Sequence, residues 1–215
     1  MKVEWLGHAS FLITSENGTR IITDPYVAGN GLNYAELNET ADIVTVSHDH
    51  FDHNQVSAVG GNPQVVKEAT PAEIKGIKFR GINTYHDANQ GKDRGDNVIL
   101  CFNVDGVNVC HLGDLGHPLS DQQIADVGSV DVLLVPVGGF FTIDAEVATR
   151  VCNKIKPRVI IPMHVKNERC EFPIASVDDF LKGKENVKKL DSSEVEFKAG
   201  ELPDVTGIVV LKPSR

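Results

Sequence analysis

Short apolar runs separated by turn-forming residues recur along the chain and predict β-strands. Asn17-Gly18 and Asp105-Gly106 are dipeptides typical of tight hairpin turns, and each one joins two such runs. The runs at 41–46 and 132–137 are apolar almost throughout, which indicates strands that are buried on both faces. The predicted strands are 3–5, 10–14, 19–23, 41–46, 64–66, 77–80, 82–85, 97–104, 107–112, 132–137, 158–162, 195–197 and 207–211.

Helical periodicity is confined to a few segments, and most of these follow an apolar run. The segment 144–156 starts with an acidic residue and is followed by Pro157, as expected for a helix with defined ends. Residues 26–40 are rich in Gly and Asn and predict a long mobile loop. Without a repeat, a low-complexity tract or a linker, residues 1–215 are expected to form a single domain. The predicted helices are 55–59, 119–127, 144–156 and 177–182.

Polar residues with metal-binding or proton-transfer chemistry stand where several predicted strands end. Strand ends gather at one edge of a layered domain, so residues that are distant in sequence can converge there. The residues in question are Asp24, His48, His86, Asp114 and His164. We therefore expect a functional site at this edge.

The stretch 47–54, Ser-His-Asp-His-Phe-Asp-His-Asn, holds four potential metal ligands, which are His48, His50, Asp52 and His53. Imidazole and carboxylate suit a borderline divalent metal such as zinc, and three protein ligands per metal leave one position for water. Four ligands in so short a loop exceed what one tetrahedral ion usually takes, which indicates two metals. The alternative is a solvated polar loop, and the rest of the chain has to decide between them.

Composition narrows the function classes further. The net charge of −9 argues against a protein that mainly grips nucleic acid backbone, because that task requires a basic surface. The amino terminus has no signal-type apolar run, and no stretch approaches the ~20 apolar residues of a membrane span. The four cysteines show neither a C-x-x-C pair nor dense spacing. They predict reduced thiols and a cytoplasmic location.

With these residues in hand, the chain resembles the metallo-β-lactamase superfamily of binuclear metallohydrolases. The phrase Trp-Leu-Gly-His-Ala-Ser-Phe-Leu-Ile at 5–13 is similar to a compact branch that includes ascorbate-6-phosphate lactonase. The resemblance spans nearly the whole chain and implies an α/β fold, the four-layer αβ/βα sandwich. The residues that match the family's five ordered motifs are Asp24, then His48, His50, Asp52 and His53, then His86, Asp114 and His164.

The resemblance also implies how these residues divide between two divalent metal ions, zinc first, with manganese or iron as alternatives. Asp114 is expected to bridge both ions, because a carboxylate has two oxygens and two-metal sites have spacings of roughly 3.5–4 Å. One ion would take His48, His50 and His86, and the other would take Asp52, His53 and His164.

Two histidines compete for the third motif. On the strand 107–112, His111 lies on the same face as Val107 and Val109, which is the apolar side. If the strand continued to Asp114, that side chain would lie on the opposite face. We therefore favour His86 as the ligand and a buried, supporting role for His111, with His111 as the alternative ligand.

Three further residues have expected roles beside the ligands. Asp24 is expected to accept an N–H from a ligand histidine and so fix its tautomer, the alternative being a plain strand-end aspartate. His8 is expected to line or support the site. His117, three residues past Asp114, is a candidate proton donor to a leaving group, and a surface histidine is the alternative.

The implied reaction is hydrolysis of an ester, lactone, amide or phosphodiester by a hydroxide held between the two ions, with Asp52 handling protons. The rival hypotheses are a tRNA-processing nuclease or other phosphodiesterase and a non-catalytic metal-binding protein. The expected partner is a small-molecule substrate, with nucleic acid and membrane not expected and a homo-oligomer left open. An anionic substrate is expected if basic loop residues contact it, namely Lys92, Arg94, Lys166 and Arg169.

Overall fold

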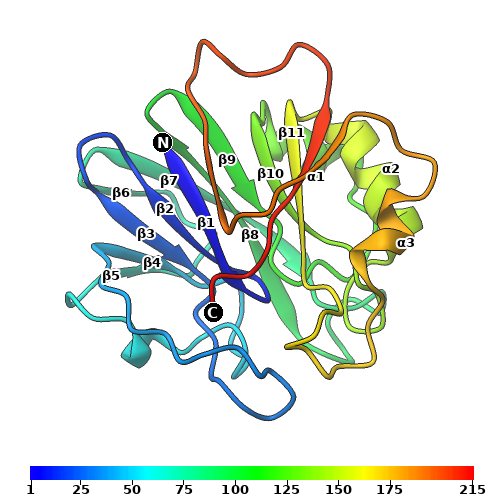
Figure 1. Ribbon diagram of the computed structural model, residues 1–215, viewed down its shortest axis with the longest axis horizontal. Helices are drawn as coiled ribbons and strands as arrows, with labels where there is room; N and C mark the ends of the chain where they lie inside the picture. The colour runs from blue at the N-terminus through cyan, green and yellow to red at the C-terminus, as the bar shows by residue number, and fades with distance from the viewer.

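The computed structural model describes residues 1–215 and consists of two facing β-sheets with α-helices on one outer side (Figure 1). The first sheet has six strands in the order β13 (Glu194–Glu196), β1 (Lys2–Gly7), β2 (Ser10–Thr14), β3 (Arg20–Thr23), β4 (Ile43–Thr45) and β5 (Gln64–Val66). The second has eight strands in the order β12 (Val187–Lys189), β14 (Gly207–Val210), β11 (Val159–Met163), β10 (Val132–Pro136), β9 (Val107–His111), β8 (Asp96–Val104), β7 (Ile77–Tyr85) and β6 (Ala72–Ile74).

Both sheets are mixed, and their parallel parts send strand ends to a common edge. In the six-stranded sheet, β3, β4 and β5 run parallel, while β1, β2 and β3 are antiparallel neighbours. In the eight-stranded sheet, β9, β10, β11 and β14 run parallel. The central β10 and β11 are buried at every position, as their unbroken apolar sequences predict.

Side chains of the six-stranded sheet alternate between two apolar layers. Phe11 and Ile13 of β2 belong to a cluster of 45 buried residues that fills the space between the sheets and continues under the helices. Leu12 between them belongs to a second cluster of 13 buried residues on the outer face. This period of two is the strand pattern seen in the sequence.

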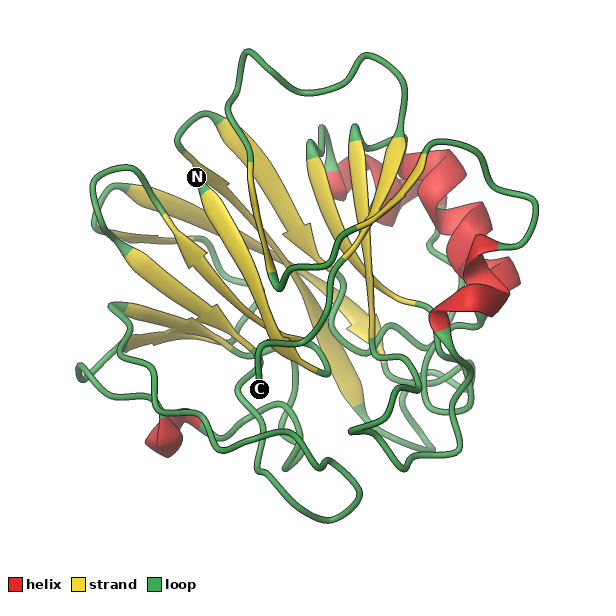
Figure 2. Cartoon of the chain, in the orientation of Figure 1, coloured by secondary structure: helices red, strands yellow, loops and turns green.

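Three α-helices lie beside β10 and β11, on the outer face of the eight-stranded sheet (Figures 1 and 2). They are α1 (Asp121–Val127), α2 (Ala145–Ile155) and α3 (Val177–Leu181), and the 3₁₀ turn η1 (Val56–Ala58) stands apart from them. Ser120 and Gln123 form a capping box at the start of α1, and Asp144 caps α2 by accepting from the Val147 N–H at 2.8 Å. None of these helices combines the length and hydropathy that a bilayer crossing requires.

The segment 26–40 covers the outer face of the six-stranded sheet, where the four-layer arrangement has its second helical layer. Tyr26, Leu32, Tyr34 and Leu37 are buried there in the second apolar cluster. The expectation of a mobile loop is therefore wrong. The Gly- and Asn-rich composition correctly predicted an irregular backbone. Apolar side chains, irregularly spaced along the segment, nevertheless anchor it to the sheet.

Other local expectations also needed correction. The strands expected at 77–80 and 82–85 form the single strand β7, because Gly81 allows the backbone of Glu68 and Ala69 to approach closely rather than ending the strand. The helix expected at 55–59 is only the turn η1, and β6 and β12 were not predicted. The four cysteines are free thiols, with the Sγ atoms of Cys101 and Cys110 lying 3.1 Å apart across β8 and β9.

Candidate metal centre

The residues predicted for the site come together at one edge of the sandwich, each directly after a strand or a few residues later. The six-stranded sheet supplies His8 after β1, Asp24 after β3 and the stretch 48–53 after β4. The eight-stranded sheet supplies His86 after β7, Asp114 after β9 and His164 after β11. The two sheets meet here, since the His164 N–H donates to the His8 carbonyl at 3.2 Å. The predicted site residues among them are buried except for His50, and Asp49 and Phe51 of the same stretch are also exposed.

Asp114 lies at the centre of the arrangement. Its Oδ2 is 3.3 Å from His53 Nε2, 3.2 Å from His86 Nε2 and 3.3 Å from His164 Nε2. Its Oδ1 has no hydrogen-bond partner. Burial alone would raise the pKa of this carboxyl, but the neighbouring His164 and His53 hold it well below its usual range, so the group is ionised.

One group of ligand atoms consists of His48, His50 and His86, which lie within 4.8 Å of one another. His48 Nε2 is 3.1 Å from His50 Nδ1, and the rings of His50 and His86 have centroids 5.1 Å apart. Burial, with His53 close by, lowers the pKa of His48 to about 3. Histidine binds metal as the neutral imidazole, through one ring nitrogen, while the other ring nitrogen donates a hydrogen bond to a neighbouring group.

A second group consists of Asp52, His53 and His164, and the structure adds His8 to it. His8 Nε2 is 3.3 Å from Asp52 Oδ2, and the His8 and His164 rings have centroids 4.1 Å apart. Burial and the neighbouring His164 lower the pKa of His8 to about 4. His8 is therefore neutral at physiological pH and can donate from Nε2 to the Asp52 carboxylate.

Asp24 supports the ligand loop from a fully buried position. Its Oδ1 accepts from the Ser47 N–H at 2.8 Å, and its Oδ2 accepts from His53 Nδ1 at 2.8 Å and from the Ser47 hydroxyl. The bond to Nδ1 leaves His53 Nε2 facing Asp114, and this nitrogen can offer its lone pair to a metal when it releases its proton. Burial would raise the pKa of Asp24, but the nearby His111 and His53 lower it.

Backbone strain accompanies these positions. His8, Asp24 and His164 have φ angles of 52°, 37° and 53°, in the left-handed region that residues with a Cβ seldom adopt. Such outliers persist where the surrounding structure holds them, and they are common at functional sites. Glycine makes the tight packing around them feasible, since a Cβ at Gly138 would collide with the His164 carbonyl.

His111 lies beside the ligand groups but has no free lone pair. Its Nδ1 accepts from the Gly113 N–H at 3.1 Å, so Nε2 carries the proton that is donated to the Ala9 carbonyl at 2.8 Å. His86, and not His111, lies with His48 and His50.

His117 is not brought to the ligand groups. Its Nε2 accepts from the Tyr85 N–H at 3.1 Å, and Nδ1 therefore donates to the Pro118 carbonyl at 2.9 Å. Both ring nitrogens are engaged with backbone, and the ring lines no part of the cavity at the ligands. The geometry thus gives no support to His117 as the proton donor.

A cavity of about 630 Å³ opens over the ligand atoms. Asn30 from the segment 26–40, Phe141 from the loop 138–141 and Phe172 from the segment after His164 line it. The other lining residues are Asp49, His50, Phe51, Asp52, His86, Arg94, Asp114 and His164. This size is in the range of small-molecule sites.

Two supporting residues escaped the sequence analysis. Asn97 is fully buried at the start of β8, where its Oδ1 accepts from the Asp114 N–H at 2.9 Å and its Nδ2 donates to Thr84 and to the Leu112 carbonyl. Ser47 links Asp24 to His48, with its hydroxyl 2.9 Å from His48 Nδ1. Only the position of Ser47, directly before the ligand stretch, could have pointed to it.

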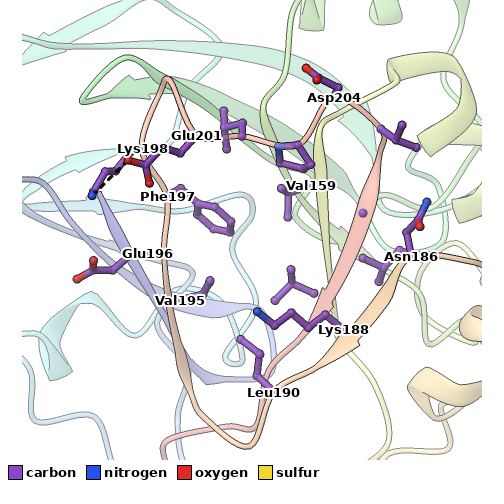
Figure 3. A pocket seen from close by; sticks show the side chains of 16 residues that line it. Val159, Asn186, Lys188, Leu190, Val195, Glu196, Phe197, Lys198, Glu201 and Asp204 are labelled. Carbon is purple, nitrogen blue, oxygen red and sulfur yellow. Dashed lines mark hydrogen bonds and ion pairs between the residues drawn. The ribbon is translucent and has the colours of Figure 1, made fainter.

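A second hollow, of about 690 Å³, lies between β13 and the β12–β14 edge and is unrelated to the ligand groups (Figure 3). Val195, Phe197 and Leu190 line it, and Lys198 pairs with Glu201 at its rim. It contains no histidine, no cysteine and no residue of the predicted site.

The residues at the strand ends fit divalent metal. Five buried ring nitrogens and carboxylate oxygens have no hydrogen-bond partner in the protein, which is costly unless a ligand satisfies them. They are His8 Nδ1, His53 Nε2, His86 Nδ1, Asp114 Oδ1 and His164 Nδ1. Imidazole and carboxylate donors at this density suit zinc, manganese or iron.

Fold and ligand set together define a metalloprotein built on a layered α/β sandwich. The chain belongs to the β-lactamase superfamily, because the family model described as "Beta-lactamase superfamily domain" matches residues 2–164.

Relatives with known names agree with this assignment. A protein of Pelotomaculum thermopropionicum named UPF0173 metal-dependent hydrolase is 31% identical, over 92% of this chain and 96% of its own length. A protein of the same name from Archaeoglobus fulgidus is 29% identical, over 94% and 97%. A crystal structure from Thermotoga maritima, described as a suspected zinc-dependent hydrolase of the metallo-β-lactamase superfamily, is 38% identical with a TM-score of 0.81, covering 98% of this chain and 97% of its own. The protein is thus a metal-dependent hydrolase of this superfamily.

Proposed function

We propose that the protein binds two divalent metal ions, most readily zinc, and hydrolyses an ester, lactone or phosphodiester of a small substrate in the cavity over them. The observation that carries the proposal is the position of Asp114, whose Oδ2 faces histidine nitrogens from both ligand groups at 3.2–3.3 Å. A carboxylate in that position can join two cations and offset their charge.

The residues divide the work as follows in this proposal. His48, His50 and His86 would hold one ion, Asp52, His53 and His164 would hold the other, and Asp114 would serve both. When bound, the ions supply Lewis acidity and lower the pKa of a water molecule from 15.7 to about 7. Hydrolysis of an ester adds this water across the acyl C–O bond and yields an acid and an alcohol.

Asp52 is the carboxylate placed to take up the proton that the water loses and to return it to the leaving oxygen. Burial would raise the pKa of Asp52, but His53 and His8 lower it below its usual value, so the group is ionised at neutral pH. His8 donates to Asp52 Oδ2 and fixes the orientation of the carboxylate. Phe51, Phe141 and Phe172 line the cavity and keep bulk water away from the reacting bond.

The test is elemental analysis of the purified protein, followed by assays with lactones, aryl esters and bis-aryl phosphodiesters. We expect close to two metals per chain and hydrolysis of at least one class. His48→Ala and Asp114→Ala should lose bound metal and lower kcat/KM by about a thousandfold or more, because they remove groups on which the hydrolytic centre depends. Asp121→Ala, a change at an exposed carboxylate of α1, is the matched control and should retain both properties.

Two outcomes would contradict the proposal. Undiminished activity of the metal-free protein would exclude metal-dependent hydrolysis. Stoichiometric metal without turnover of any substrate class would favour the non-catalytic metal-binding alternative. Turnover of bis-aryl phosphodiesters alone would direct the search towards phosphodiesterases.

A further inference from the structure

Arg94 is a charged residue in the cavity whose guanidinium group has no hydrogen-bond or ion-pair partner in the protein. It lies in the loop 86–95 between β7 and β8, and its guanidinium group is 5.5 Å from the centre of the Phe141 ring. No carboxylate forms an ion pair with it, and none of its side-chain N–H groups donates a hydrogen bond within the protein, although Asp49, Asp52 and Asp114 line the same cavity. Five donors in a fixed planar arrangement thus stay available to a ligand.

The backbone under Arg94 is held firmly. The carboxylate of Asp87 accepts four backbone N–H groups of this loop, those of Asn89 and Gly91 on Oδ1 and those of Asp93 and Arg94 on Oδ2, at 2.7–3.0 Å. His86, a ligand in the proposed centre, directly precedes Asp87. The position of Arg94 is therefore fixed relative to the ligand atoms, and its stacking on Phe141 restricts the side chain further.

Aromatic rings extend from Arg94 to the ligand groups. The Phe141 and Phe172 rings meet edge to face with centroids 5.6 Å apart, and the Phe172 ring is 5.7 Å from the His8 ring. Arg94, Phe141 and Phe172 thus form one continuous wall of the cavity, and the Phe172 ring ends against the buried His8, which lies behind the lining. The wall is positive at one end, apolar in the middle and reaches the Asp52–His8 pair at the other.

A guanidinium group stacked on an aromatic ring with its edge free is suited to bind a carboxylate or phosphate through two hydrogen bonds. Between Arg94 and the Asp52 end, this wall presents only the Phe141 and Phe172 rings, so it favours a ligand whose middle part is apolar.

We propose that the substrate is an amphipathic oxyanion whose anionic group binds Arg94 and whose apolar part packs on Phe141 and Phe172. This assignment rests on the proposed function, because it places the bond to be hydrolysed at the Asp52 end of the wall. It adds a specificity-determining residue and a substrate class to that function.

The test compares two esters that differ only in charge, mono-para-nitrophenyl glutarate and para-nitrophenyl pentanoate. Arg94→Gln should raise KM for the anionic ester by about ten- to hundredfold, the range expected from charge-assisted hydrogen bonds, and leave kcat/KM for the neutral ester unchanged. Arg94→Lys should restore part of the loss, since a single ammonium group replaces a two-point contact. Lys92→Gln, in the same loop but outside the cavity lining, is the matched control and should change neither ester.

A binding measurement separates this inference from the proposed function. Phenylmethanesulfonate, a weak metal ligand, should bind the wild-type holoprotein in calorimetry and lose at least about tenfold in affinity with Arg94→Gln. Binding that depends on Arg94, without turnover of either ester, would support the anion site and count against the hydrolase proposal. An equal effect of Arg94→Gln on both esters, equal sulfonate binding by wild type and Arg94→Gln, or the same loss with Lys92→Gln would overturn the inference. Competition by phenylacetate and by phenyl phosphate then shows whether a carboxylate or a phosphate is preferred.

Discussion

At the residue scale, Asp24 shows how much of the centre depends on groups that touch no metal in the proposed scheme. It is completely buried, yet both of its oxygens are satisfied by Ser47 and His53. Its φ of 37° tolerates aspartate or asparagine better than most other residues. The position therefore constrains both the backbone conformation and the hydrogen-bonding pattern.

Asp24→Asn should weaken metal binding by about 10–100-fold, the usual effect of losing a carboxylate that orients a ligand histidine. The substitution keeps the size of the side chain and suits the left-handed backbone, so the fold should survive. Competition titration with a chelator measures the affinity, and urea unfolding checks the fold. Asp105→Asn, at another left-handed aspartate that lies on the β8–β9 turn, is the control. Equal affinities for all three proteins would show that Asp24 does not position the ligand.

Sequence patterns locate residues whose type and spacing carry the chemistry, and they miss residues that act through backbone. The stretch 48–53 could be recognised because four potential ligand residues fall within six positions. The strand parity that excluded His111 agrees with its observed hydrogen bonds to Ala9 and Gly113. The role of Asn97 could not be predicted, because no sequence pattern shows from which distant N–H an asparagine at the start of a strand accepts a hydrogen bond.

At the scale of elements, irregular segments complete the site as much as strands do. The segment 26–40 meets the segment after His164 in an isolated bridge between Leu32 and Cys170. The Tyr34 hydroxyl also accepts from Asn167 Nδ2 at 2.7 Å, and the Tyr34 ring packs directly on Gly7, next to His8. These contacts join two loops that each contribute a residue to the cavity wall.

Tyr34→Phe should lower the free energy of unfolding by about 0.5–1.5 kcal/mol, the net value of one hydrogen bond, because the ring stays in place. Asn167→Ala should have an effect of similar size. The double variant should cost clearly less than the sum if the two side chains act through their mutual bond, as urea denaturation can measure. Strict additivity of the two effects would contradict a direct contact between the loops.

How well each helix or strand could be predicted from the sequence depends on its length and on the periodicity of its apolar residues. The hairpin predicted at 97–104 and 107–112 is observed as β8 and β9, and the helix predicted at 144–156 is observed as α2. A turn dipeptide, an acidic cap and a following proline mark their ends in the sequence. The strands β6 and β12, Ala-Glu-Ile and Val-Lys-Lys, have three residues each and no apolar pair, whereas the equally short β5 was predicted from its adjacent valines. The covering role of 26–40 depends on which face of the sheet lacks helices, and no local pattern encodes that.

At the scale of the whole molecule, burying so many histidines links stability to pH. In the metal-free protein, burial lowers the pKa of His8 to about 4 and that of His48 to about 3, against 6.5 for an exposed histidine. Between pH 6.5 and about 4, the unfolded chain therefore binds protons that the folded chain does not bind. His53 behaves oppositely, since Asp114 and Asp52 raise its pKa against the effect of burial. The folded chain holds this proton over the whole range, whereas the unfolded chain takes it up as the pH falls through 6.5, so His53 reduces the slope only near pH 6.5.

The free energy of unfolding of the chelated protein should thus fall as the pH is lowered from 6.5 towards 4, by about 1.4 kcal/mol per pH unit for each of the two histidines. Urea unfolding at a series of pH values measures the slope. Metal should flatten the profile near neutral pH, because it binds the folded state. A stability that stays constant over this interval would mean that these histidines are hydrated in the folded protein.

The arrangement of the ligands along the chain also determines when the centre can exist during synthesis. The residues at the strand ends run from His8 to His164, and both sheets must supply their share. A nascent chain on the ribosome therefore carries only fragments of the site until residue 164 has emerged. The stretch 48–53 is available long before that, but without His86, Asp114 and His164 it offers an ion no enclosed set of ligands. In the proposed scheme, the protein therefore binds its metal only after both sheets have folded together, and not while the chain is being synthesised.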